Sequence, residues 1–187
     1  MSHEQSRLHI DYAQITGGMS HPQRTCFRWF YNKGMALPST SAVRLQTQLD
    51  CLPILLTGIR DDALDHKPAS SKWSARENLA HLARYHEGFL ERFQRIRTEN
   101  QPLLPRYRAE EDPEWPRWNV LPAQEVLSRL QTLRAQLLQP MAQLTDSDWS
   151  RTGLHSRFGP MTLVQWLEFF LLHEAHHLLA VLQRVRE

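Results

Sequence analysis

The chain has 187 residues, of which 41% are hydrophobic, and a formal net charge of +2 at pH 7. This length and apolar content predict one domain of ordinary size with a hydrophobic core. No run of like charges marks a nucleic-acid-binding tail, and Glu168 and the histidines interrupt the best candidate for a membrane span. The polar N-terminus lacks a signal-peptide pattern, and the distant Cys26 and Cys51 predict no disulfide. We therefore expect a cytoplasmic protein with neither a nucleic-acid nor a membrane partner.

Residues 1–40 differ from the rest of the chain. They show no sustained helical period and are interrupted by Gly17, Gly18 and Pro38. The run at 24–30 is basic and aromatic, which makes a nucleic-acid or membrane contact conceivable. An extension that packs on the domain, or that has no fixed structure, is the simpler expectation. We predict an irregular extension over 1–40 and one domain over 41–187.

Four amphipathic helices are predicted in that domain, because apolar residues recur there at spacings of three and four. They cover residues 41–56, 74–97, 122–144 and 161–187. Pro53 lies late in the first helix and is expected to kink or shorten it. Ser74 with Glu77, and Thr162 with Gln165, have the spacing of a capping box at a helix start.

The segments between these helices predict long connections. Residues 100–121 are rich in proline and read as a crossover loop, and residues 144–160 form a connector with Gly153 and Gly159 as turn residues. Strand-like alternation is scarce, and no glycine-rich phosphate loop is present. The predicted fold is an all-α four-helix bundle with one long crossover.

The last helix carries histidines in the middle of its inward-facing seam. His173 and His177 are four residues apart and therefore point the same way, whereas His176 lies on the flank of the seam. Two imidazoles facing a core need partners. A divalent metal such as zinc, nickel, iron or copper would satisfy both rings, and a hydrogen-bonded, metal-free histidine cluster is the alternative.

The same segment also matches the HExxH pattern of zinc proteases, from His173 through Glu174 to His177. Glu174 would then be a general base. The short stretch after His177 offers no third protease ligand of the usual kind, so we expect Glu174 to support a neighbouring histidine or helix, or to lie on the surface. His155, in the connector, could reach the mouth of a site, although an exposed loop histidine is the simpler expectation.

The second helix adds two histidines with different expected positions. His81 lies at the edge of the apolar face of this helix, four residues before Tyr85. His86 lies about 140° around the helix from His81. We therefore expect His86 on a solvated face, away from any site at His81.

Several of these motifs together resemble the DinB/YfiT-like superfamily over about residues 42–187. They are Trp73-Ser74 with Glu77, His81-Leu82, and the C-terminal segment from His173 to His177. The resemblance implies a four-helix bundle that binds a divalent metal through His81, His173 and His177. Zinc is the first candidate, with nickel, iron or manganese as alternatives, and a homodimer is a family-level expectation. Relatives commonly carry an acidic residue a few positions after the histidine of the second helix. Residues 83–85 of this chain contain no acidic residue, so we assign no acidic role there.

Two kinds of function follow from this resemblance. The first, which we expect, is a metal-dependent transferase that activates a low-molecular-weight thiol or water on the three-histidine site and acts on a small molecule; a metal-dependent hydrolase is a further alternative of this kind. The second is a non-catalytic metal-binding or stress-associated bundle. Glu174, His155 and His176 are candidates for supporting the ligands or lining the mouth of the site. The resemblance assigns no catalytic residue.

Overall fold

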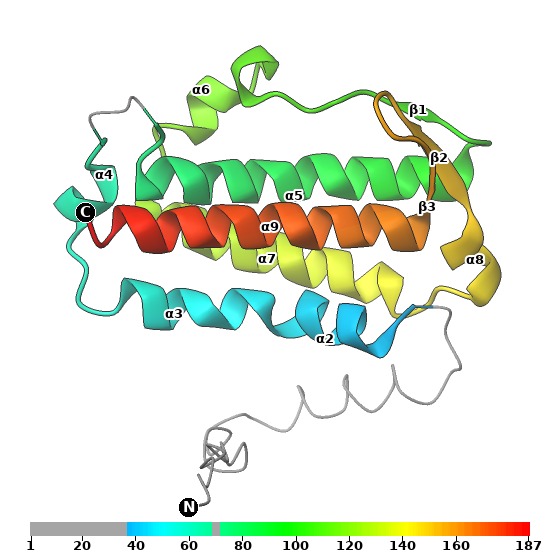
Figure 1. Cartoon of the computed structure of the whole chain (residues 1–187), viewed down its shortest axis with the longest axis horizontal. Coiled ribbons are helices and arrows are strands. Elements are labelled where there is room, and N and C mark those ends of the chain that lie inside the picture. The colour runs from blue at the N-terminus through cyan, green and yellow to red at the C-terminus, as the bar shows by residue number, and fades with distance from the viewer. Residues whose placement is uncertain (1–36, 69–71) are drawn as a thin grey trace, which may run out of the picture. The chain divides into compact units, whose positions relative to one another are not determined.

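The computed structural model describes residues 37–68 and 72–187, and these form a four-helix bundle, as predicted (Figure 1). The first bundle helix is made of three consecutive segments: α2 (Ser39–Thr47), the 3₁₀ turn η1 (Gln48–Asp50) and α3 (Cys51–Leu56). The other three bundle helices are α5 (Ala75–Thr98), α7 (Ala123–Met141) and α9 (Leu163–Arg184). α5 packs against both α7 and α9, and α2 packs against α9. The predicted N-terminal extension lies outside the described residues except for its last four, and α2 begins within them at Ser39.

The first helix is interrupted rather than continuous. The 3₁₀ turn η1 separates α2 from α3, immediately before the segment that contains Pro53. Proline has no amide hydrogen to donate to the carbonyl four residues earlier, Leu49, and its ring crowds that carbonyl. The predicted effect of Pro53 is therefore seen one turn N-terminal to it. The interruption also places Gln48 where its side chain reaches α9.

The connections contain more structure than predicted. α4 (Asp61–Asp65) precedes α5, and the crossover carries β1 (Leu103–Leu104), η2 (Ala109–Glu111) and α6 (Trp115–Trp118). The later connector forms α8 (Asp146–Ser150), β2 (Thr152–His155) and β3 (Gly159–Thr162). β1 pairs in parallel with β2, and β2 pairs antiparallel with β3. This small sheet lies at the end of the bundle where α9 begins, opposite the C-terminus (Figure 1).

The two glycines of the connector have different roles. Gly159 has a φ of +73° at the start of β3, which suits its predicted place in a turn. Gly153 was expected in a turn as well, but it lies within β2. A Cβ there would come within 2.9 Å of side-chain atoms of Ile96 and Leu104, so this position requires glycine because the strand packs closely on α5.

Both predicted capping boxes form and fix where the two site-bearing helices start. The Ser74 side chain accepts from the Glu77 amide, and the Glu77 carboxylate accepts from the Ser74 amide at 2.8 Å. Thr162 and Gln165 make the equivalent pair at the start of α9. The start and phase of α5 and α9 are therefore fixed by local hydrogen bonds in addition to the packing of their faces.

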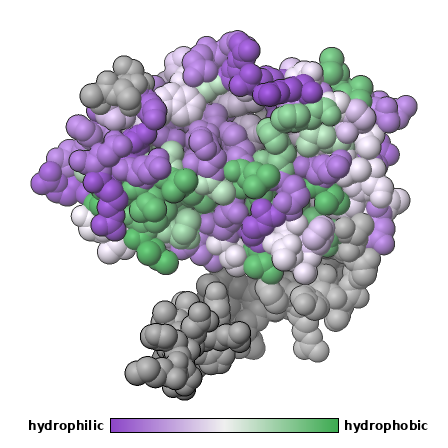
Figure 2. All heavy atoms as spheres, viewed as in Figure 1, coloured by the Kyte–Doolittle hydropathy of each residue, from purple (hydrophilic) through white to green (hydrophobic). Residues whose placement is uncertain are grey.

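The core fills the space between the four helices. Trp149, Trp166, Phe89 and Phe170 are among its fully buried large side chains. Figure 2 shows apolar patches among polar side chains on the face where α9 is nearest the viewer, and Leu172 and Leu179 are exposed residues of α9. Within 37–68 and 72–187, no helix is both long and apolar enough to cross a membrane. The homodimer stays a prediction.

Candidate metal centre

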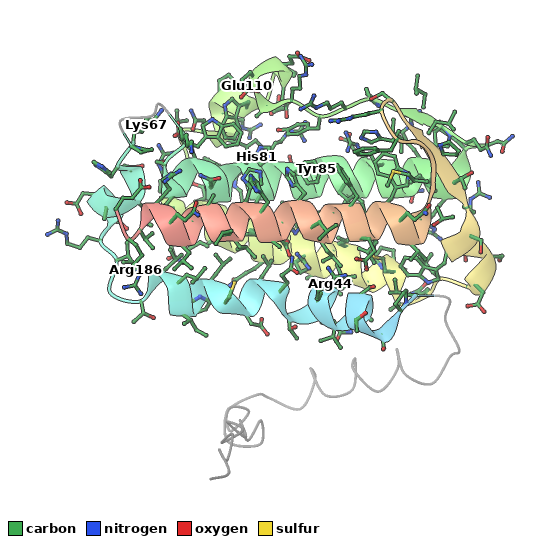
Figure 3. All side chains as sticks on the ribbon, viewed as in Figure 1. Arg44, Lys67, His81, Tyr85, Glu110 and Arg186 are labelled. Atoms are coloured by element: carbon green, nitrogen blue, oxygen red, sulfur yellow. The ribbon has the colours of Figure 1, made fainter. Side chains whose placement is uncertain are left out.

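α5 and α9 bring together the three histidines that the resemblance indicated. His81 comes from α5, and His173 and His177 come from successive turns of α9. Each ring offers one nitrogen, and these nitrogens all lie within 4.8 Å of one another. His81 and His177 are buried and His173 is partly buried. Figure 3 labels His81 on α5, above α9, with Tyr85 one helical turn further on.

The His81 and His173 rings meet without satisfying each other. Their Nε2 atoms are 3.1 Å apart, so in the absence of a cation one Nε2 must donate and the other accept. The Nδ1 atom of each ring is buried and has no hydrogen-bond partner among the described residues. When one Nε2 donates to the other, the accepting ring carries its hydrogen on an unpaired Nδ1, and an unsatisfied buried N–H costs about 1–3 kcal/mol. The metal-free pair is therefore only partly satisfied.

His177, in contrast, is held in one orientation by Asn78. Its Nδ1 lies 2.8 Å from Asn78 Oδ1, and the Asn78 amide nitrogen donates to the Ser74 carbonyl at 2.8 Å. That second bond fixes Oδ1 as the atom facing His177, so Nδ1 of His177 carries the hydrogen. In this tautomer Nε2 of His177 has a free lone pair, as a metal ligand requires.

All three rings are held in their neutral form. Burial lowers the pKa of His81 to about 3, with further lowering by His177 and His176. Burial and the neighbouring histidines lower the pKa of His173 to about 2. Burial, followed by His176, lowers the pKa of His177 to about 4. A buried cluster of neutral imidazoles presents lone pairs and no charge of its own, and such a group can receive a cation.

The residues fit a divalent metal in both chemistry and spacing. Imidazole nitrogen is a preferred ligand of zinc, and zinc–nitrogen bonds of about 2.0–2.1 Å place two ligand nitrogens at most about 4.2 Å apart. The observed 4.8 Å envelope is within a small side-chain rotation of that value. Three protein ligands leave an open coordination position, whereas structural zinc sites normally have four protein ligands.

Aromatic side chains surround the cluster. The Trp73 ring lies 4.8 Å from the His81 ring and 5.1 Å from Trp115 of α6, measured between centroids. Tyr85 lies 4.0 Å from His173 and Tyr107 lies 5.5 Å from His81. Trp73 thus packs directly on the cluster. This wall limits water access and keeps the local dielectric low.

A cavity of about 270 Å³ opens onto the cluster at His81 and His173. It is bounded by α5, α9, the crossover after β1 and the β2–β3 turn. The lining residues besides the two histidines are Tyr85, Arg92, Arg106, Tyr107, His155, Arg157, Phe158 and Phe169. A small molecule could therefore approach the histidines from this side.

Glu174 belongs to a different site in the core. It is fully buried and pairs with Arg134 of α7, and Gln48 donates to its Oε1 at 2.8 Å. Burial alone would raise the pKa of Glu174, but His86 and Arg134 outweigh it and hold that pKa below its usual value. Since Arg134 and Gln48 hold this carboxylate, it is not placed as the base of an HExxH protease. The expectation that it supports a neighbouring helix fits, and the surface alternative does not.

The prediction for His86 was wrong in one respect. His86 is not in the three-histidine cluster, as expected, but it is completely buried rather than solvated. Its Nδ1 donates to the Leu82 carbonyl at 2.7 Å, and its Nε2 lies 3.1 Å from Arg134 and 3.2 Å from Glu174. The physical reason is that α5 packs against two other helices, so its side away from His81 faces α7 instead of solvent.

The two remaining candidates differ in position. His176 is exposed on α9 and is not among the clustered ligands, although its ring lies 5.0 Å from that of His177. His155 is not the exposed loop residue that we considered simpler: it is 5% exposed, ends β2 and lines the cavity. It can therefore contact a molecule bound at the mouth.

Comparison with known proteins places the chain in a family. The sequence model of the DinB superfamily matches residues 44–181. The chain belongs to the DinB superfamily. The Bacillus subtilis protein YuaE is 26% identical over 136 residues, covering 66% of this chain and 83% of YuaE. A protein of Oceanobacillus iheyensis, named "Putative metal-dependent hydrolase OB0782", is 27% identical over 135 residues, covering 70% of this chain and 78% of its own.

A solved structure agrees at the level of the fold. YfiT from Bacillus subtilis, described as a probable metal-dependent hydrolase with an unusual four-helix bundle topology, superposes with a TM-score of 0.65 and 20% identity. The match covers 98% of this chain and 92% of YfiT. This DinB chain thus shares the YfiT bundle, and the resemblance seen in the motifs is confirmed.

Sequence reasoning missed Asn78 and Arg134 in this DinB bundle. Asn78 lies three residues before His81, so helical spacing alone puts it on the same face of α5. That spacing could have suggested Asn78 as a partner of the histidines. No comparable signal marks Arg134, because a charged residue in a leucine-rich helix normally lies on the solvated face.

Proposed function

We propose that this chain is a divalent-metal-dependent enzyme that acts on a small molecule, with His81, His173 and His177 as the metal ligands. The observation that carries this proposal is the meeting of three neutral imidazoles, two of which, His81 and His173, line a cavity of about 270 Å³. A purely structural metal would be expected to have four protein ligands and no such opening. Zinc is the first candidate, and nickel, iron or manganese are alternatives.

The metal ion and the residues around the three histidines have separate roles in such a site. When bound, a divalent ion supplies a Lewis acid and lowers the pKa of a bound water or thiol toward neutrality. Asn78 keeps the Nε2 lone pair of His177 directed to the cluster. Trp73, which does not line the cavity, packs on the ring of His81 and excludes solvent from that side. Approach of substrate is left to the cavity side.

Two nucleophiles are compatible with this site. The name of the Oceanobacillus iheyensis relative and the description of YfiT support water, and hence hydrolysis. The family resemblance supports a low-molecular-weight thiol, and hence S-transfer to an electrophile. We take hydrolysis as the first proposal and thiol transfer as the second, and both use the same three ligands.

The test compares metal-free protein with protein reloaded with zinc, nickel or manganese. Each form is given a panel of small esters and amides, and separately a low-molecular-weight thiol with a panel of electrophiles. We expect metal-dependent turnover that is abolished in His177→Ala and retained in His176→Ala, the exposed neighbour on the same helix turn. Turnover that needs no added thiol identifies hydrolysis, and turnover that needs it identifies transfer. Stoichiometric metal without turnover in either panel would contradict the enzymatic proposal and favour the non-catalytic alternative.

A further inference from the structure

Three arginines surround the cavity above the histidine cluster. Arg92 comes from α5, Arg106 from the segment after β1, and Arg157 from the turn between β2 and β3. Among residues 37–68 and 72–187, no carboxylate forms an ion pair with any of the three. None of the described residues that line the cavity is acidic. Most other arginines of the bundle do pair with an acid, so this concentration of unpaired positive charge requires an explanation.

We propose that this cavity binds the anionic group of a small organic substrate through Arg92, Arg106 and Arg157, and so directs the rest of the molecule to the histidine cluster. The inference rests on the proposed function in taking the cavity as the substrate site. It goes further by giving the substrate a charge and an orientation: a carboxylate at the arginine end and the reacting atom at the His81–His173 end.

Arg92 is already positioned for such a role. Its guanidinium donates to the Pro105 carbonyl at 2.7 Å and lies over the rings of Tyr85 and Trp166, 5.8 and 5.7 Å from their centroids. A guanidinium group has five N–H donors, and these contacts leave others free. An arginine fixed by stacking and one carbonyl loses less side-chain entropy on binding a carboxylate than a mobile one does.

His155 adds a neutral donor beside the arginines. Its Nδ1 accepts from the backbone amides of Arg157 and Phe158, at 3.0 and 3.1 Å. In the neutral ring the hydrogen is therefore on Nε2. Burial lowers the pKa of His155 first, and Arg92, Arg157 and Arg106 lower it further. All three arginines therefore lie close enough to His155 for their charge to disfavour its protonation.

The remaining walls select for an apolar body. Phe158 packs against Phe169, and Tyr85 packs against Tyr107 beside His81. At about 270 Å³, the cavity is slightly smaller than the usual range for ligand sites, about 300–1,000 Å³. These properties fit a compact carboxylate carried on an aromatic or aliphatic group, and a highly charged polymer would not enter.

The test uses benzoate and its neutral isostere benzamide as probes, titrated into the full chain by calorimetry, with and without bound zinc. We expect saturable binding of benzoate and much weaker binding of benzamide. Arg106→Gln and Arg157→Gln should each raise the Kd for benzoate about tenfold, the effect of losing one charge-assisted hydrogen bond. Both residues are exposed on loops, so these variants should keep the fold, which circular dichroism checks.

Arg186→Gln is the matched control, because it removes the same charge from an exposed residue at the other end of the bundle (Figure 3). It should leave benzoate binding unchanged. Equal binding of benzoate and benzamide, no saturable binding, or wild-type affinity in both arginine variants would overturn the proposal. Binding that requires zinc and is lost in His177→Ala, but not in the arginine variants, would also overturn it, because the anion would then be held by the metal.

These results separate this inference from the proposed function. If the protein binds no metal but the metal-free form discriminates benzoate from benzamide through Arg106 and Arg157, the anion site stands and the metal-dependent enzyme fails. If metal is bound at the three histidines and benzoate binding is insensitive to both arginines, the metal site stands and the anion site fails. Zinc content measured on each variant decides between the two cases.

Discussion

The Nδ1 atom of His177 lies 2.8 Å from Oδ1 of Asn78, one face of α9 against one face of α5. The Asn78 amide nitrogen donates back to the Ser74 carbonyl in the first turn of its own helix. The start of α5 therefore determines the tautomer of a histidine 99 residues away in the chain. A proposed metal ligand is thus oriented by the other helix of the site.

Replacing Asn78 with alanine should lower metal affinity about 10- to 100-fold, the usual effect of removing a partner that orients a ligating histidine. The His177 ring would then be free to rotate and to adopt the other tautomer. Asn78→Asp, which keeps an acceptor at the same place, should retain most of the affinity. Competition with a chelator of known affinity measures both, and equal affinity in wild type and Asn78→Ala would contradict this role.

Removing Arg134 should destabilise the bundle severely. Arg134→Met leaves the buried Glu174 carboxylate without its cation, which typically costs about 3–5 kcal/mol. The double variant Arg134→Met with Glu174→Leu removes both charges and should recover a large part of this loss. Part will remain, because Gln48 and His86 lose partners.

Urea unfolding measures the free energy of unfolding of both variants. A loss below about 1 kcal/mol in Arg134→Met would show that the pair is not the buried interaction described here. Metal content of the double variant provides a second readout. It should equal that of wild type, because Glu174 is not one of the clustered ligands. Loss of metal from a folded double variant would show that Glu174 contributes to metal binding.

The metal-free protein should lose stability as the pH falls below about 6.5. Folded-state pKa values of about 3 for His81, about 2 for His173 and about 4 for His177 lie below the unfolded value, so the unfolded chain binds protons that the folded chain does not. Each such histidine removes about 1.4 kcal/mol per pH unit until its folded-state pKa is approached.

Thermal unfolding of metal-free protein between pH 7 and 5 measures this dependence. His173→Ala removes one of these groups and should give a shallower fall in Tm than wild type. A Tm that is independent of pH over this range, or a slope unchanged by His173→Ala, would show that the rings are not held neutral.

Two glycines offer opposite predictions. Gly153→Ala should destabilise the protein by about 1–3 kcal/mol, because its Cβ would overlap with Ile96 and Leu104 where β2 meets α5 and β1. Gly88→Ala, inside α5 with nothing within 4 Å of the added Cβ, should be neutral or stabilise by up to about 1 kcal/mol. Tm measurements on the pair test the packing of the small sheet, and a neutral Gly153→Ala would contradict it.

Local signals predicted the parts of this structure that local chemistry determines. The two capping boxes, the four-residue spacing of His173 and His177 and the bundle itself follow from helix periodicity and cap residues. His81 as the third member came from the family resemblance, since periodicity placed it only at the edge of a face. Its clustering with the other two depends on how α5 and α9 pack.

Features that depend on packing between distant segments were not predictable in this way. Periodicity gave the angle of His86 from His81 but not the presence of α7 on its other side. The three-stranded sheet was missed because strands of two to four residues containing Gly153 and Pro160 are too short to show alternation. Burial of His155 follows from that sheet and was missed with it.

The central claim is that His81, His173 and His177 hold one divalent metal ion. The most direct measurement is elemental analysis of the untagged protein beside His177→Ala and the matched control His176→Ala, after each is loaded with zinc and freed of excess. We predict about one equivalent of metal in wild type and in His176→Ala, and a large loss in a folded His177→Ala. Wild-type protein that retains no divalent metal, or a His177→Ala protein that retains a full equivalent, would contradict the account.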